Sequence, residues 1–321
     1  MNNIAQKIRE ATEKHHSDII EIRRRLHTYP ELSFQETKTS AFVQEKLTEW
    51  GIPFNTGYAE TGIVGYIKGV NPGSKTIALR ADLDALPISE ENDVSYKSKN
   101  AGVMHACGHD VHTSSLLGAA KILNGLKQEL EGTIKLIFQP GEEKLPGGAK
   151  LMIEEGVLEN PKPLCVIGQH VFPDLETGKV GFRKGMYMAS TDEIYVTVKG
   201  KGGHAALPHT VIDPVLISSH IIIALQQIIS RNANPRQPTV LTFGNIVGLG
   251  ATNIIPNEVN IAGTFRAMNE TWREDAHSRR TVAPGRRFRE RAGSSPRPSH
   301  QISGPSCALP AHRGSVALVY N

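Results

Sequence analysis

The sequence predicts an α/β protein of two domains, and three observations carry this prediction. The chain has 321 residues, 39% of them hydrophobic, which is enough for two cores at roughly 100–200 residues per domain. Residues 1–181 alternate short apolar runs with helical patterns, which is typical of a layered α/β domain. Residues 182–278 instead show a strand-helix-strand-strand-helix pattern with one-sided strands, which indicates a smaller α+β domain.

The elements of the first domain follow from periodicity and from the residues that end each run. Apolar residues at helical spacing predict one helix that stops near Pro30 and a second that ends near Gly51. His27, in the first helix, reads as an ordinary surface residue. A third helix carries Leu116 and Ala120 on one face. Buried strands are expected at Thr76–Asp82, 133–138 and 165–168.

The second domain has its own signals. Apolar and polar residues alternate from Ile194 to Val198, which predicts a strand with one solvated face. Asp213 followed by Pro214 predicts the start of a helix, because aspartate caps and proline suits the first helical position. We expect its buried stripe to hold Ile217, Ile221, Ala224, Leu225 and Ile228. Two further strands and a polar helix are expected at 239–243, at 258–265 and from Glu270.

The net charge of +4 belongs to the end of the chain. Residues 279–321 hold eight Arg, no Lys and a single acid, whereas the rest is mildly acidic, so the charge does not indicate a nucleic-acid partner. The composition changes abruptly near residue 278. It fits a disordered basic tail or a shift of the reading frame, and we favour the frame shift.

The cellular location is predicted from the apolar runs, the first residues and the number of cysteines. The longest apolar runs, such as 221–225, fall far short of the roughly 20 residues that a bilayer span needs. The first residues are polar and charged, unlike a signal peptide. Three cysteines are too few and too odd in number for a disulfide framework. We therefore expect a cytoplasmic protein.

The densest cluster of reactive side chains lies at 104–112. Three His, one Cys and one Asp fall within eight residues there, which ordinary core packing explains poorly. Side chains two residues apart in an extended segment point the same way, so Cys107 and His109 can face one metal site together.

More polar side chains follow the predicted strands. Asp82 and Asp84 come at the end of one strand, Glu142 and Glu143 follow the next, and His170 follows the third. Adjacent glutamates on a loop are usually only solvated charge, but loops at the carboxyl ends of strands are where α/β domains collect ligands. With the cysteine and histidine above, these residues form a donor set suited to one or two Zn, Mn or Co ions.

Four segments, at 80–87, 104–112, 139–143 and 200–209, resemble the M20 metallopeptidase superfamily. The branch they resemble is that of the N-acyl-amino-acid amidohydrolases, of the bacterial aminoacylase and hippurate hydrolase types. The resemblance extends over about residues 12–278. It implies a three-layer α/β catalytic domain with a mixed sheet and two bound metal ions, and an inserted α+β lid domain through which two subunits form a homodimer.

The resemblance divides the chain into three parts. Residues 1–181 match the N-terminal part of the di-metal catalytic domain, and 182–278 match the lid or dimerisation domain. Family members then return to the catalytic domain and supply a last histidine ligand, which 279–321 do not match. The chain therefore reads as truncated or frameshifted after about residue 278, with an aberrant basic tail. We expect an uncovered sheet edge and a chain that is unstable or weakly active.

The resemblance also implies the roles of individual residues. The matched metal ligands are Cys107, His109, Glu143 and His170. Glu142 matches the general base, and Asp84 matches an acidic residue that supports the metal site. The lid residues His204, Asn253 and Arg266 match groups that polarise the scissile carbonyl or hold the substrate carboxylate. Of these, His204 is implied to reach into the site of the partner subunit.

Together these observations predict a metal-dependent amidohydrolase that cleaves N-acetyl or N-benzoyl amino acids. Water at neutral pH attacks an amide poorly, and a metal ion overcomes this by lowering the pKa of water to about 7. Two alternatives stay open: a di- or aminopeptidase of the same superfamily, against which the Cys-Gly-His-Asp motif at 107–110 argues, and an inactive dimeric pseudoenzyme that lacks the C-terminal region. Neither a nucleic acid nor a membrane is an expected partner.

Overall fold

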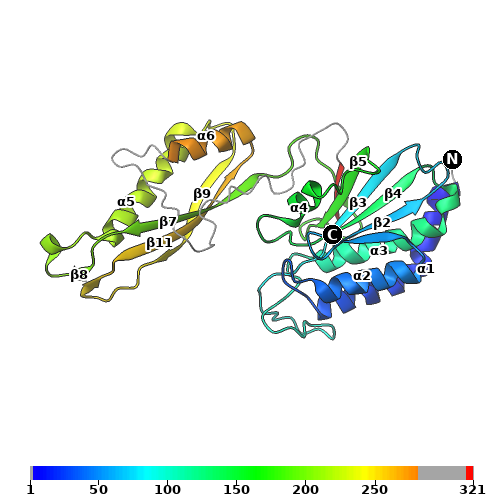
Figure 1. The fold of residues 1–321 in the computed structure, drawn as a ribbon, viewed down its shortest axis with the longest axis horizontal. Helices are drawn as coiled ribbons and strands as arrows, with labels where there is room; N and C mark the ends of the chain where they lie inside the picture. The colour runs from blue at the N-terminus through cyan, green and yellow to red at the C-terminus, as the bar shows by residue number, and fades with distance from the viewer. Residues whose placement is uncertain (1–2, 281–315, 321) are drawn as a thin grey trace. The chain divides into compact units, whose positions relative to one another are not determined.

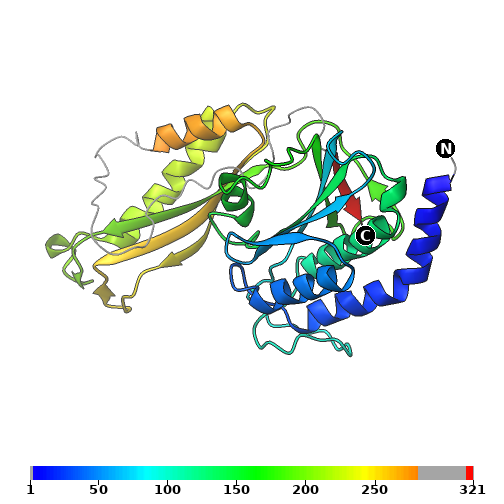
Figure 2. The same ribbon diagram turned by 45° about the vertical axis from the view of Figure 1, so that its right-hand side comes forward.

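The computed structural model describes residues 3–280 and 316–320. They fall into two compact units, each described by itself below. The first contains the chain up to Gly185 together with the strand at 316–320, and the second begins at Met186. Figures 1 and 2 show the elements of both units from two directions.

The first unit is built on a seven-stranded sheet with the order β1-β2-β4-β3-β5-β12-β6. β3 pairs in parallel with both β4 and β5, whereas β2 pairs antiparallel with β4, so the sheet is mixed, as the family resemblance implies. The three strands predicted in this unit are all present. The strands are β1 (Phe54–Tyr58), β2 (Gly62–Lys68), β3 (Thr76–Asp82), β4 (Thr133–Gln139), β5 (Cys165–Val171), β6 (Val180–Gly181) and β12 (Val316–Tyr320).

Helices cover this sheet on both faces. α1 (Asn3–Thr28), α2 (Thr37–Glu49) and α3 (His109–Gly125) pack on one face, and α4 (Gly148–Glu154) packs on the other (Figure 1). The short helix η1 spans Lys127–Glu129. The larger core lies under the three long helices and includes Leu26, Val43, Leu47, Leu117, Leu136 and Phe138. This packing leaves the carboxyl ends of the parallel strands free to carry polar loops.

β12 changes one expectation about the edge of the sheet. It pairs in parallel with β5 over 167–171, and antiparallel with β6. The sequence analysis expects an uncovered sheet edge without assigning it to a strand, and along this stretch of β5 the edge is covered by β12. Residues 281–315, where most of the predicted basic tail falls, lie outside the described residues.

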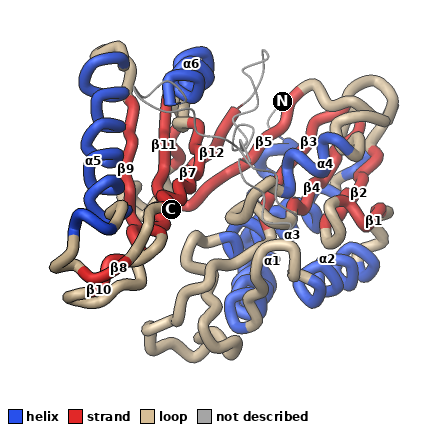
Figure 3. Tube along the Cα trace, turned by 60° about the vertical axis from the view of Figure 1, so that its left-hand side comes forward, coloured by secondary structure: helices blue, strands red, loops and turns tan. Residues whose placement is uncertain are grey.

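The second unit is the α+β block that the sequence predicts. Its antiparallel sheet has the order β7-β11-β9, and α5 and α6 pack beside it (Figure 3). Ile194, Leu241 and Phe265 form the centre of its core with Ile228. The elements are β7 (Ser190–Lys199), β8 (Gly203–His204), η2 (Pro208–Thr210), α5 (Pro214–Gln227), η3 (Ile228–Asn232), β9 (Thr239–Val247), β10 (Ile254–Ile255), β11 (Glu258–Ala267) and α6 (Glu270–Arg280).

α5 begins where the sequence predicts but buries a different face. Asp213 Oδ1 accepts hydrogen bonds from the N–H groups of Val215 (2.8 Å) and Leu216 (3.1 Å), which caps the helix. The predicted buried stripe is partly wrong, because Ile217 and Ala224 are exposed. Apolar residues lie outside the predicted stripe as well, among them the exposed Val215, Leu216 and Ile223, so periodicity could not choose the buried face.

With η3, this helix forms the 19-residue segment Pro214–Asn232, whose length and mean hydropathy of 1.2 would also suit a bilayer span. This is weak evidence, and it is the one such helix among the described residues. The segment packs on β7 and β11 of its own unit through Ile221, Leu225 and Ile228.

Candidate metal centre

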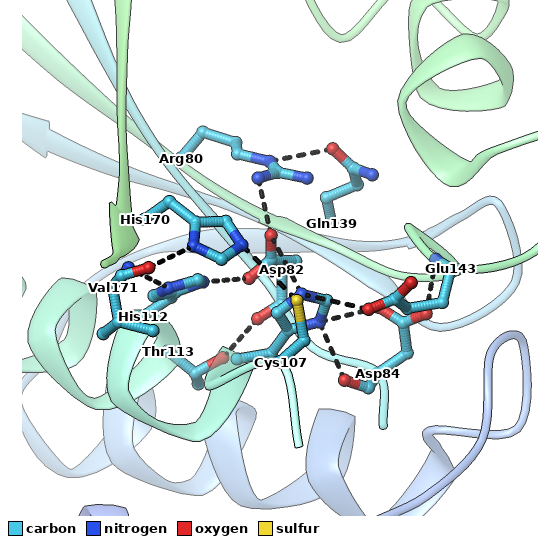
Figure 4. A network of polar contacts seen from close by, with 12 residues as sticks. Arg80, Asp82, Asp84, Cys107, His112, Thr113, Gln139, Glu143, His170 and Val171 are labelled. Carbon is cyan, nitrogen blue, oxygen red and sulfur yellow. Dashed lines mark hydrogen bonds and ion pairs between the residues drawn. The ribbon is translucent and has the colours of Figure 1, made fainter. Parts of the chain in front are cut away.

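The polar side chains singled out in the sequence lie together at the carboxyl ends of the parallel strands of the first unit. Asp84 follows β3, Glu142 and Glu143 follow β4, His170 lies near the end of β5, and Cys107 precedes α3. Because β3, β4 and β5 are parallel, their carboxyl ends meet at the same edge and the N-terminus of α3 lies over it (Figure 4).

Two groups of possible metal-binding atoms share one histidine. Cys107, His109 and His170 offer ligand atoms that lie within 4.8 Å of one another, and so do His109, Glu142 and Glu143. The Cys107 Sγ lies 3.4 Å from the His170 Nε2, and the His109 Nε2 lies 3.8 Å from the Glu143 Oε1. The structure thus brings all five residues together around His109.

Asp84 fixes the orientation of His109. The His109 Nδ1 donates to the backbone carbonyl of Asp84 at 2.8 Å and lies 3.3 Å from its carboxylate Oδ1. Its Nε2 is buried and has no hydrogen-bond partner among the described residues. A histidine whose one nitrogen is held by a supporting group presents the other as a ligand, which is the usual arrangement at metal sites.

His170 is oriented in a comparable way. Its Nδ1 donates to the carbonyl of Val171 at 2.7 Å, so its Nε2 faces Cys107. The hydrogen bond with Cys107 is the largest of the contributions that raise the pKa of His170, and burial opposes it.

A third group of possible ligands is already occupied by protein contacts. The Asp82 carboxylate accepts from Arg80 at 2.7 Å and from the His112 Nδ1 at 2.7 Å, and the His112 Nε2 accepts from the N–H of Val171 at 2.9 Å (Figure 4). Burial lowers the pKa of His112. Burial opposes ionisation of Asp82, but the charges of Arg80 and His109 hold its pKa well below the usual range. These residues therefore serve the site as supports.

The centre is strongly negative and favours a bound cation. Burial alone would lower the pKa of His109, yet the charge of Asp82 and the hydrogen bond with Asp84 raise it to about 11. A site that stabilises a proton on a buried imidazole to this degree also stabilises a metal cation in its place.

The residues fit a borderline divalent ion. The donor set combines one thiol, two imidazoles and carboxylates, and a buried imidazole nitrogen points into the set without a partner among the described residues. Soft and borderline ligands of this mixture suit Zn, Mn or Co better than Mg or Ca.

Glu142 stands beside the possible ligands in a different electrostatic setting. The residue is exposed as a whole, but enough protein atoms lie around its carboxyl group that partial burial, followed by the negative charge of Asp82, raises its pKa. A carboxylate with a raised pKa is a stronger base than a free one.

The three predicted lid residues lie in the second unit and are not all brought together. His204 pairs with Ile254 across β8 and β10, and the Asn253 carbonyl accepts from the N–H of Ala205 at 3.0 Å. Arg266 lies near the other end of β11, eight residues beyond Glu258. That separation corresponds to roughly 27 Å of strand at about 3.4 Å per residue.

Two supporting residues have no assigned role in the sequence analysis. His112 belongs to the cluster at 104–112, and its role could have been found, since it lies three residues after His109 on α3 and therefore on the same helix face. Ser33 could not, because the hydrogen bond from its Oγ to the Asp84 Oδ2 (2.6 Å) joins residues that the chain separates by 51 positions.

His27 is a correction to the sequence analysis, because it is buried and not a surface residue. Its Nδ1 lies 2.8 Å from the Asp110 Oδ2 and its Nε2 lies 3.0 Å from the Glu90 Oε1. The hydrogen bond with Asp110 is the largest contribution that raises the pKa of His27, and burial opposes it. Protonated His27 therefore ties α1 to α3 directly behind His109.

This raised pKa predicts a pH-dependent stability. The stabilisation is fully present below the unfolded pKa of about 6.5 and is lost as the pH rises through the higher folded pKa. The free energy of unfolding, from urea titrations between roughly pH 5.5 and 8.5, should fall with pH more steeply in the parent than in His27→Gln. Parallel curves for the two proteins would contradict the assignment.

A layered α/β domain that gathers thiol, imidazole and carboxylate donors at its strand ends is suited to bind metal ions. Residues 78–280 match the model of peptidase family M20/M25/M40. The chain is 44% identical over 268 residues to an N-acyl-L-amino acid amidohydrolase of Geobacillus stearothermophilus, covering 84% of this chain and 72% of the relative. The chain belongs to peptidase family M20/M25/M40.

Two further relatives agree with this membership. An N-acetyl-L-cysteine deacetylase of Bacillus subtilis strain 168 is 47% identical over 261 residues, which is 81% of this chain and 62% of the relative. The crystal structure of a dinuclear metal-binding peptidase of the M20 family, also from Bacillus subtilis, has a TM-score of 0.67 at 36% identity, covering 84% of this chain and 69% of that one. The family and these names place the chain among the metal-dependent hydrolases that act on amides.

Proposed function

We propose that this protein hydrolyses the amide bond of N-acyl amino acids of the N-acetyl or N-benzoyl type. The observation that carries the proposal is the buried Nε2 of His109, which has no hydrogen-bond partner in the described part of the chain and lies close to a thiol and two carboxylates. In this proposal Cys107, His109, Glu143 and His170 hold two divalent ions of the Zn, Mn or Co type. The names of the two curated relatives support an acylated amino acid as the substrate.

Glu142 is the general base in the proposed mechanism. The bound ions would supply acidity to water and polarise the scissile carbonyl. The Glu142 carboxylate accepts the proton of the attacking water, and its raised pKa makes it a better acceptor. The same carboxyl group then donates that proton to the leaving nitrogen, because an amine leaves only when it is protonated. Asp84 keeps His109 and the Glu143 backbone in place.

We propose further that the second unit completes the site in a cytoplasmic homodimer. Arg266 would hold the substrate carboxylate, while His204 and Asn253 would polarise the carbonyl. His204 lies on β8, which pairs with β10 shortly before β11 begins, whereas Arg266 lies near the end of β11. This separation supports a dimer in which His204 serves the partner's site.

The test is turnover of N-acetyl-methionine and of hippurate by the full chain. We expect hydrolysis with added Co²⁺, Mn²⁺ or Zn²⁺, loss of activity after chelation and recovery when the metal is returned. Cleavage of dipeptides in preference to both substrates would favour the peptidase alternative. Metal binding without turnover of any of them would favour the pseudoenzyme.

A further inference from the structure

A loop remote in sequence contacts the segment that carries the proposed base. It spans 31–36 and connects α1 with α2. Phe34 lies there at a φ of +64°, a conformation that few side-chain-bearing residues adopt. Its ring atoms lie 2.4–2.7 Å from the position that a Cβ on Gly141 would occupy, and Gly141 itself has a φ of +55°. A side chain at Gly141 would therefore have to displace the Phe34 ring, and the positive φ of Gly141 itself favours glycine.

Glu36, at the end of the same loop, is fully buried. Its Oε1 accepts a hydrogen bond from the backbone N–H of Gly141 at 2.8 Å, and its Oε2 accepts one from the Thr61 Oγ1 at 2.8 Å. Burial raises the pKa of this carboxyl group. Burying a carboxyl group costs free energy of folding, which its hydrogen bonds must offset, so this contact suggests a role beyond stability.

Glu142 lies between two backbone groups that are held by separate buried carboxylates. The N–H before it, of Gly141, donates to Glu36, and the N–H after it, of Glu143, donates to Asp84 at 2.9 Å. The Gly141 carbonyl also accepts from the N–H of Gly148 at 2.9 Å. The backbone on both sides of Glu142 is therefore fixed, and with it the direction in which its side chain leaves the chain.

We propose that Glu36 is a positioning residue for Glu142, acting through the N–H of Gly141. The proposal rests on the proposed function of Glu142 as the general base. The Glu36 carboxylate hydrogen-bonds Gly141 and Thr61, neither of which is a proposed metal ligand. It holds the loop so that the carboxylate of Glu142 lies at a productive distance from the attacking water. A misplacement of a catalytic group by about 1 Å can lower the rate roughly 100-fold.

The experiment compares three variants of the full chain. Glu36→Ala removes the acceptor, whereas Glu36→Gln keeps a carbonyl oxygen for Gly141 and an amide that Thr61 can accept from. Glu31→Ala is the matched control. The Glu31 carboxylate accepts hydrogen bonds from the N–H groups of Lys38 (3.2 Å) and Thr39 (2.8 Å) at the start of α2. The Glu31→Ala substitution therefore removes a comparable number of hydrogen bonds from a carboxylate of the same loop.

Amide hydrogen exchange gives a readout that does not need activity. In Glu36→Ala the Gly141 amide should exchange roughly tenfold faster or more, as expected when a hydrogen bond to a charged group is lost. Glu36→Gln should restore protection. Glu31→Ala should speed exchange at residues 38 and 39 and leave Gly141 unchanged. Unchanged Gly141 exchange in Glu36→Ala would overturn the proposal, as would a general rise over the whole unit.

Kinetics then tests the catalytic consequence. Glu36→Ala should lower kcat for N-acetyl-methionine roughly 10- to 100-fold with little change in KM, and Glu36→Gln should recover most of the rate. An unchanged kcat in Glu36→Ala would overturn the inference. A parent chain without turnover would instead overturn the proposed function, and hydrogen exchange would still decide whether Glu36 holds the loop.

Discussion

Glu142→Gln is expected to lower kcat for N-acetyl-methionine by roughly 10²- to 10⁴-fold, the usual contribution of a positioned general acid or base. The amide of glutamine has nearly the shape of the carboxylate but does not accept a proton from water at neutral pH. KM should change little, because the proposed ligands are Cys107, His109, Glu143 and His170. The measurement is steady-state kinetics with metal content determined on the same samples.

The control is Glu154→Gln, which removes one negative charge from the surface of the same unit. Its carboxylate lies on α4 and is 59% exposed, 3.9 Å from Lys150, so its removal should leave kcat unchanged. A normal kcat in Glu142→Gln would show that another group moves the proton. A loss of bound metal in that variant would show instead that Glu142 is a ligand.

Much of the first unit could be predicted because its signals are local. The runs that form β3, β4 and β5 are short, apolar and bounded by turn residues. A continuous apolar run of this kind is the usual sequence pattern of a strand buried on both faces. The polar residues of the centre come directly after these strands. Once a parallel sheet is expected, the side chains at its carboxyl ends are expected to meet, and Cys107, Glu143 and His170 do so around His109.

The supporting residues could not be predicted because their contacts are remote in the chain. The carboxylate of Glu36 reaches Gly141 across 105 positions, and His27 reaches Asp110 across 83. No periodicity records such pairs. A glutamate before a helix and a histidine within one look like ordinary polar residues until the tertiary fold buries them. His27 was misread for this reason.

The buried face of α5 and the strand β12 beside β5 could not be predicted, for two other physical reasons. A helix whose apolar residues extend beyond one stripe does not define its buried face, so the sequence assigns Ile217 to the core although it is 38% exposed. An uncovered sheet edge is expected because residues 279–321 do not match the segment with which family members return to the catalytic domain. A run of five apolar or aromatic residues at 316–320 was nevertheless sufficient to form β12.

His109→Ala is expected to abolish metal binding and to destabilise the metal-free protein. His109 is the member that both groups of possible ligands share, so its loss removes a nitrogen donor from each. It is also the cation that lies against the buried carboxylates of Asp82 and Asp84, at 3.7 and 3.3 Å. Removing one partner of a buried ion pair costs about 3–5 kcal/mol, because the remaining charge stays buried.

The destabilisation should depend on pH in a defined direction. The pKa of His109 is raised from 6.5 to about 11 in the folded protein, so its stabilisation is fully present below pH 6.5 and is lost as the pH rises toward 11. Urea unfolding of metal-free parent and variant should therefore differ most in acid and neutral solution. His16→Ala, an exposed histidine on α1, controls for the loss of an imidazole.

A second variant keeps the metal prediction testable if His109→Ala does not fold. His109→Gln can still donate to the carbonyl of Asp84 and fills most of the same volume, but it offers no imidazole nitrogen. Equilibrium dialysis with Co²⁺ should show binding by the parent and by His16→Ala and none by His109→Gln. If the folded His109→Gln variant bound Co²⁺ as tightly as the parent, then Cys107, Glu143 and His170 would suffice to hold the ion. His109 would then not be a ligand.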